Sequence, residues 1–170
     1  HAPTMTSSGF NEHVAVHLMH GQGDLSWLTA WWETTGIPRL PTPDAEGVCA
    51  QAMKSRPRLI VIDARGDAEW EDLAVRTCQR LKADAYTAIV PVLVIVHTER
   101  FAEAFAAGAD EVLRDDVSDR EATARLSAML RRSDRDTDVH PSTRLPGTRE
   151  IEAELSRRVA SGEKFAACYA

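Results

Sequence analysis

The sequence predicts an α/β protein built on a doubly wound, five-stranded parallel sheet with five helices, followed by a C-terminal extension that contains a further helix. Over residues 13–132, short runs rich in β-branched residues alternate with longer segments of helical period. The runs Leu59–Ile62 and Ala88–Val96 are apolar throughout, which is typical of central strands covered by helices on both faces. At 170 residues the chain has room for one such domain and a small appendage.

The first half of the pattern opens with the apolar run Val14–Met19, which predicts a strand. Apolar side chains at helical spacing follow it, and Asp24 stands where the N-cap of that helix belongs. Ile37–Leu40 leave room only for a short strand interrupted by proline. Thr42–Asp44 combine a cap, a first-turn proline and an acid, so we expect a helix here that buries Met53.

The second half continues the alternation after a buried strand that ends on Asp63. Apolar residues at helical intervals predict a helix over Trp70–Leu81, and the strand Ala88–Val96 follows. Phe101–Ala106 predict a short helix, closed by a glycine, and Glu111–Leu113 a short strand. Ser118–Glu121 is a capping box, which indicates where the last helix of the domain begins.

We expect four segments in the chain. Residues 1–12 are interpreted as a disordered N-terminus whose first four residues are left over from cloning, and residues 13–132 as the α/β domain. Residues 133–139 are a polar, acidic linker, and residues 140–170 begin a further domain that is cut short. The chain is therefore expected to be a piece of a longer protein.

Composition and charge exclude several classes of protein. The formal charge is -6, from 26 acidic and 20 basic residues, which disfavours binding to nucleic acid. Three widely spaced cysteines indicate neither a disulfide framework nor a zinc cluster. Because no secretory signal and no membrane-spanning apolar run is present, we expect a cytoplasmic protein without a membrane partner.

The candidate site lies where the parallel strands end, because ligands of open α/β sheets bind at the carboxyl ends of the strands. Asp63 ends a central strand, and His20 and Asp24 follow the first strand. Val96 and Thr98 close the fourth strand, and Asp115 follows the fifth. One alternative is therefore a small α/β protein that binds a nucleotide or a metal in this crevice.

Three segments of the chain resemble the response-regulator receiver domains of two-component signalling. They are Arg56–Asp63, Val90–Val96 and Gly108–Leu113, and the resemblance covers about residues 13–132. It implies a flavodoxin-like fold in which Asp63 stands at the phospho-acceptor position. It also implies a magnesium ion held by an acid pair after the first strand, a hydroxyl residue after the fourth and a lysine after the fifth.

The chain departs from this pattern at every partner of Asp63. Met19–Gly21 stand in place of the acid pair, with His20 as the nearest crevice neighbour and Asp24 better placed as a cap. Val96 occupies the hydroxyl position, with Thr98 two residues later, and Asp115 replaces the lysine. We therefore interpret the domain as a pseudo-receiver with no catalytic residues, no cofactor and no resident metal. The alternative is a receiver phosphorylated on Asp63, for which Mg²⁺ would be the cofactor.

A second, shorter resemblance follows the linker. Asp138–Gly147 is similar to the opening of a GGDEF domain, the diguanylate cyclase module, which often follows a receiver. The catalytic signature of that module would lie beyond Ala170, so this chain is not expected to be an enzyme.

The resemblances together imply a regulatory module in cyclic di-GMP signalling that acts on a GGDEF-type output domain through a protein partner or a homodimer. The implied contact face comprises the fourth helix, the fifth strand and the fifth helix. Its interface candidates are Phe101, Phe105, Leu126 and Met129.

Overall fold

The computed structural model describes residues 14–138 and 148–162, except residues 22, 24 and 56. The chain divides into two compact units, residues 1–130 and 131–170. The predicted disorder of residues 1–12 and most of the segment that resembles a GGDEF opening lie outside the described residues.

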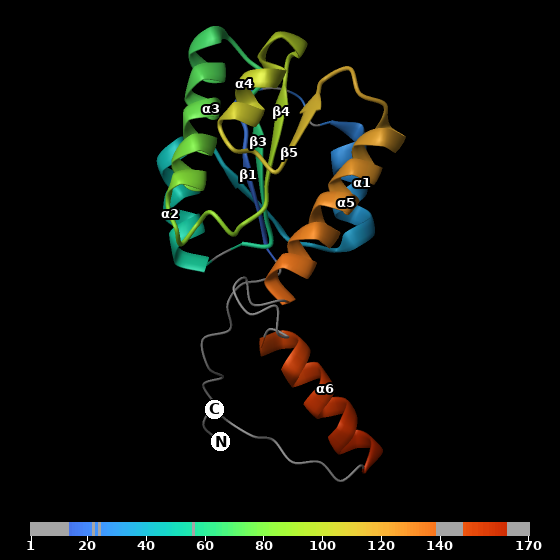
Figure 1. The fold of residues 1–170 in the computed structure, drawn as a ribbon. Helices are drawn as coiled ribbons and strands as arrows, with labels where there is room; N and C mark the ends of the chain where they lie inside the picture. Colours follow the sequence, from blue (N-terminus) through green and yellow to red (C-terminus); the bar gives the residue numbers. More distant parts are fainter. Residues whose placement is uncertain (1–13, 22, 24, 56, 139–147, 163–170) are drawn as a thin grey trace, which may run out of the picture. The chain divides into compact units, whose positions relative to one another are not determined.

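Strands and helices alternate along the first unit as the sequence predicts, which confirms the α/β class (Figure 1). In chain order the elements of this unit are β1 (Ala15–Leu18), α1 (Ser26–Thr35), β2 (Arg39–Thr42), α2 (Ala45–Ser55), β3 (Leu59–Asp63), α3 (Ala68–Ala83), β4 (Val92–Val96), the 3-10 turn η1 (Thr98–Arg100), α4 (Phe101–Ala106), β5 (Glu111–Arg114) and α5 (Asp119–Asp138). The helix α5 continues past the boundary of the unit, and α6 (Thr148–Ser161) belongs to the second unit.

The five strands form one parallel sheet in the order β2-β1-β3-β4-β5. In the register, Leu18 lies opposite Ile62, and Asp63 lies opposite Ile95. The strand order reverses between β1 and β3, and in doubly wound sheets this switch point opens a crevice at the carboxyl ends of the strands. Asp63, as the last residue of β3, lies at this edge.

Each face of the sheet has its own hydrophobic core, because successive side chains of a strand point to opposite faces. Ile60 and Ile62 of β3 pack in the core that α2, α3 and α4 cover. Leu59 and Val61 pack in the core that α1 and α5 cover, where the three tryptophans of α1 are also buried. Helices on both faces explain why β3 and β4 are continuously apolar.

Two local details of the helices α1 and α2 differ from the sequence-based expectations. The N-cap of α1 is Leu25, whose side chain makes no capping bond, so the predicted cap at Asp24 is wrong. Met53 is 50% exposed rather than buried, because Cys49 and Ala52 already fill the inward stripe of α2.

The long helix α5 also differs from its expected length. It extends to Asp138, through most of the segment interpreted as a linker. No glycine or proline interrupts the chain between Asp119 and Asp138, so nothing local ends the helix earlier. In the part of the chain that the structure describes, no helix is long and apolar enough to cross a membrane.

Candidate functional site at the carboxyl edge of the sheet

Asp63 occupies the edge of the sheet that the sequence analysis expects. Strand β3 is buried along its whole length, and its last residue, Asp63, is only 4% exposed. A buried carboxylate needs hydrogen-bond donors or a cation, since an isolated buried charge is costly. The identity of these partners therefore decides what Asp63 can do.

The partner of Asp63 is Arg65, two residues further along the chain. Arg65 Nε donates to Asp63 Oδ1 at 2.9 Å and Arg65 Nη2 donates to Asp63 Oδ2 at 2.7 Å, which makes a two-pronged ion pair. The backbone N–H of Arg65 also donates to Asp63 Oδ1, at 3.1 Å. The hydrogen bond to Asp63 raises the pKa of Arg65, against the effect of partial burial, and the negative charges of Asp63 and Asp115 raise it further.

Sequence reasoning missed Arg65. The signal was present, because a residue two positions after a strand-end acid can reach back to it across the turn. The turn is tight here: a Cβ on Gly66 would lie 2.6 Å from Trp70 Cδ1. Gly66 therefore allows the loop after β3 to approach α3 closely while Arg65 folds over Asp63.

The position after β1, where the receiver pattern has acids, is used for ring packing. The imidazole of His20 stacks on the indole of Trp70, with ring centroids 4.5 Å apart. Trp70 in turn donates its Nε1–H to the backbone carbonyl of Asp63 at 2.9 Å. His20 thus packs on Trp70, whose indole bonds the backbone of Asp63, and it brings no carboxylate to Asp63. Asp24 lies outside the described residues.

The residue that follows β4, His97, and the residue that follows β5, Asp115, form a histidine–carboxylate pair. His97 Nδ1 and Asp115 Oδ2 are 2.6 Å apart. Val96 is 1% exposed and part of the core, and Thr98 is exposed in η1. Arg114, the last residue of β5, pairs with Asp116 at 3.2 Å.

Magnesium, the metal that the receiver pattern implies, does not fit this arrangement. Mg²⁺ requires several oxygen ligands in octahedral geometry. The carboxylate of Asp63 is already bound by Arg65, and that of Asp115 by His97. Among the described residues, no group of three or more His, Cys, Asp or Glu side chains is placed to hold a metal ion.

The contact face expected on α4, β5 and α5 is only partly at the surface. Two of its four interface candidates are buried in the core, so their expected role in contacts is corrected. Leu126 and Met129 are 0% and 2% exposed and pack in the core between the sheet, α1 and α5. The apolar stripe of α5 is the stripe that holds the helix on the sheet, so it is not available for a partner. Phe105 is 42% exposed and packs edge-to-face on the half-buried Phe101, with ring centroids 5.1 Å apart.

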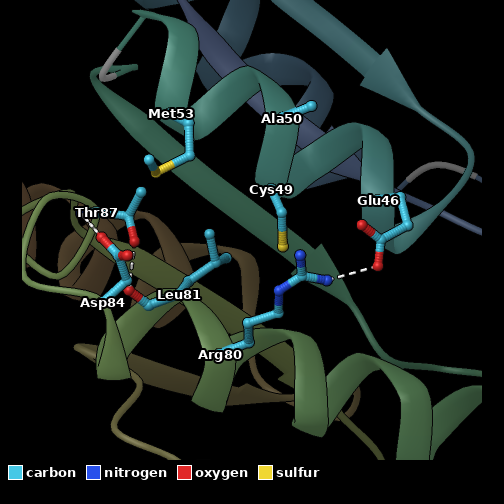
Figure 2. A pocket seen from close by; sticks show the side chains of 8 residues that line it. All are labelled: Glu46, Cys49, Ala50, Met53, Arg80, Leu81, Asp84 and Thr87. Atoms are coloured by element: carbon cyan, nitrogen blue, oxygen red, sulfur yellow. Dashed lines mark hydrogen bonds and ion pairs between the residues drawn. The ribbon is translucent and has the colours of Figure 1, made fainter.

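A cavity of about 340 Å³ lies elsewhere, between α2 and α3 (Figure 2). Its lining includes the buried Cys49, with Met53 at the rim and Arg80 reaching across from α3 to pair with Glu46. None of the described crevice residues lines it. Burial raises the pKa of the Cys49 thiol, which favours the neutral, unreactive form.

Comparison with known proteins is informative at the level of structure. No family model matches the sequence, and no curated protein matches it. Solved receiver domains do share its fold. A CheY-like response regulator receiver domain protein from Methanospirillum hungatei JF-1 is 12% identical with a TM-score of 0.55, and the match covers 72% of this chain and 98% of that one.

Two further receiver domains belong to larger signalling proteins. The signal receiver domain of a signal transduction histidine kinase from Syntrophus aciditrophicus is 16% identical with a TM-score of 0.54, covering 78% of this chain and 98% of that one. The signal receiver domain of a modulated diguanylate cyclase from Desulfovibrio desulfuricans G20 is 18% identical with a TM-score of 0.54, covering 72% and 96%. The chain therefore has the flavodoxin-like receiver fold.

Proposed function

We propose that this chain is a regulatory signalling module: an atypical receiver domain that controls a GGDEF-type output domain through protein contacts or dimerisation, without aspartyl phosphorylation. The observation that carries the proposal is the state of Asp63. Its carboxylate is held on both oxygens by Arg65, and the residue that follows β5 is the acid Asp115, which lies beside His97.

Electrostatics support the absence of phosphorylation. Transfer of a phosphoryl group builds negative charge on its oxygens, which a metal ion and a cation must stabilise in the transition state. Single groups of this kind are commonly worth roughly 3 kcal/mol, so the absence of two slows transfer by about four orders of magnitude. Asp115 adds a charge of the wrong sign at this edge.

The output domain is proposed from the segment after α5 and from the fold comparison. Asp138–Gly147 resembles a GGDEF opening, and one of the proteins with the same fold is the receiver domain of a diguanylate cyclase. The extension of α5 to Asp138 supplies a continuous helix from the receiver-like unit toward that segment. We propose no catalytic activity for the chain itself, and cytoplasmic localisation and a lack of nucleic-acid or membrane partners remain part of the proposal.

The test is incubation of the chain with acetyl phosphate and Mg²⁺, followed by intact-mass and peptide mass spectrometry. We expect no phosphoryl adduct, and no heat on titration with beryllium fluoride, while a phosphorylatable receiver treated in parallel is modified. The Asp63→Asn variant provides the blank for any adduct elsewhere. An adduct that appears on Asp63 and is missing from the variant would refute the proposal and restore a phosphorylation switch.

The contact part of the proposal is tested at Phe105, the exposed member of the expected face. If the chain associates through this face, Phe105→Glu weakens self-association in sedimentation analysis by at least about tenfold, since apolar anchors dominate interface energies. Phe105→Leu is the matched control that keeps an apolar group. Self-association that Phe105→Glu leaves unchanged would exclude this face.

A further inference from the structure

Three oxygen atoms converge on the guanidinium of Arg65. Asp63 Oδ1 lies 2.9 Å from Arg65 Nε, Asp63 Oδ2 lies 2.7 Å from Nη2, and the backbone carbonyl of Gly23 accepts from the same Nη2 at 3.0 Å. Gly23 belongs to the loop after β1, and Asp63 ends β3. The guanidinium therefore sits in a small cage of oxygens at the switch point of the sheet, an environment suited to a cation.

The Asp63–Arg65 pair is largely shielded from water, although Gly23 itself is exposed, and this distinguishes the pair from an ordinary surface ion pair. The side chain of Asp63 is 5% exposed and that of Arg65 is 13% exposed. Surface pairs contribute little, whereas removal of one partner from a buried pair leaves an uncompensated charge. The carboxylate of Asp63 therefore requires a cation at this place as long as it is ionised.

Other basic side chains that the structure describes near the ends of β4 and β5 have other partners. Arg100 pairs with Asp72 and Glu103, Arg114 pairs with Asp116, and His97 lies beside Asp115 and Glu71. The charge of Asp115 also favours a cation at Arg65, because it contributes to the raised pKa of that group.

We propose that Arg65 is the resident cation of this site: its guanidinium fills the cation position beside Asp63 from within the chain and so closes the crevice to divalent metal ions. This inference rests on the proposed function and deepens it, since it names the residue that keeps Asp63 out of metal-dependent chemistry. Arg65 acts as a positioning residue that also ties the loop after β1 to the loop after β3.

The first test measures Mn²⁺ binding to the full chain through its effect on the relaxation of water protons. The wild-type protein is expected to show no binding that depends on Asp63. Arg65→Met removes the charge but keeps much of the side chain, so it should open the oxygen cage to Mn²⁺. The added substitution Asp63→Asn should abolish that binding, and Arg65→Lys, which keeps a cation, should behave as the wild type.

Stability gives an independent readout. Arg65→Met should lower Tm by on the order of 10 °C, because Asp63 is left buried without a cation. Asp63→Asn in the same background should recover most of that loss, since it removes the unpaired charge. If the Arg65→Met variant does not fold, the Arg65→Gln variant takes over the test, because it keeps a hydrogen-bond donor without the charge. The Arg65→Gln variant should then bind Mn²⁺.

The matched control is Arg114→Met, which removes the same charge from the same edge but from a side chain that is 50% exposed. It should change neither Tm nor Mn²⁺ binding. Mn²⁺ binding to wild type through Asp63 would overturn the inference, as would charge-removing variants of Arg65 that bind no Mn²⁺ or lose no stability. An adduct on Asp63 after acetyl phosphate instead refutes the proposed function, so the two failures are distinguishable.

Discussion

Leu126→Ala tests whether the apolar stripe of α5 is core or contact surface. Leu126 is fully buried against the sheet and α1. The substitution removes about three carbon atoms, worth roughly 2.4 kcal/mol in lost transfer free energy at about 0.8 kcal/mol each. The cavity that remains adds to this, so we expect a loss of about 3 to 4 kcal/mol in the free energy of unfolding.

Urea denaturation followed by tryptophan fluorescence measures this loss. The buried tryptophans of α1 report on the same core, and the m-value should stay unchanged if only stability is altered. In a thermal melt the expected decrease in Tm is about 10 °C. Phe105→Ala is the comparison: with 42% of Phe105 exposed, it should cost only about 1 kcal/mol.

The opposite pattern would refute the reasoning. If Leu126→Ala leaves the free energy of unfolding within about 0.5 kcal/mol of wild type but changes self-association, then the residue faces a partner and its place in the core is wrong.

Three further predictions concern the packing around the sheet. Gly66→Ala should lower the free energy of unfolding by about 1 to 3 kcal/mol, because the new Cβ would lie 2.6 Å from Trp70 Cδ1. Unchanged stability in urea denaturation would show that the turn has room for the methyl group. Lys82→Met should lower the free energy of unfolding by about 1 to 3 kcal/mol in the same assay. Lys82 Nζ lies 2.5 Å from Asp110 Oδ2 and also donates to two backbone carbonyls of the following loop. Unchanged stability would mean that solvent screens this ion pair. Burial raises the pKa of Cys78 from 9.0 to about 12, so the fold binds the thiol proton more tightly than the unfolded chain does. Its contribution to stability is complete below pH 9 and is lost as the pH rises toward 12, and Cys78→Ala should lack this component in a series of melts at increasing pH.

Much of the fold is predictable because helix and strand periods are local properties of the sequence. The alternation of apolar runs and helical segments predicts all five strands of the sheet, and the buried run ending on Asp63 places the acid at the carboxyl edge. The boundaries are less predictable: β2 begins two residues later than expected, at Arg39, and α5 continues to Asp138. Helix ends depend on capping and on contacts beyond the local segment.

The candidate site shows the same division. The absence of an acid pair after β1 and the presence of the acid Asp115 after β5 are visible in the sequence itself. The pairing of Asp115 with His97 depends on two neighbouring strands, β4 and β5, ending side by side. The burial of Leu126 depends on which face of α5 meets the sheet. Helical periodicity in the sequence identifies the apolar face of this helix, but it does not say whether the sheet or a partner covers that face.

The sequence by itself determined the class of the fold, the edge at which Asp63 lies and the absence of an acid pair after the first strand, because each follows from residue type and short-range spacing. Only the tertiary structure decided that Arg65 holds Asp63. The same guanidinium also donates to the carbonyl of Gly23, which lies 42 positions before Arg65 in the chain, and the adjacent Gly66 lies close against Trp70. A residue two positions after a strand-end acid is near enough to reach back to it, but whether it does so depends on the three-dimensional geometry of the turn and its surroundings.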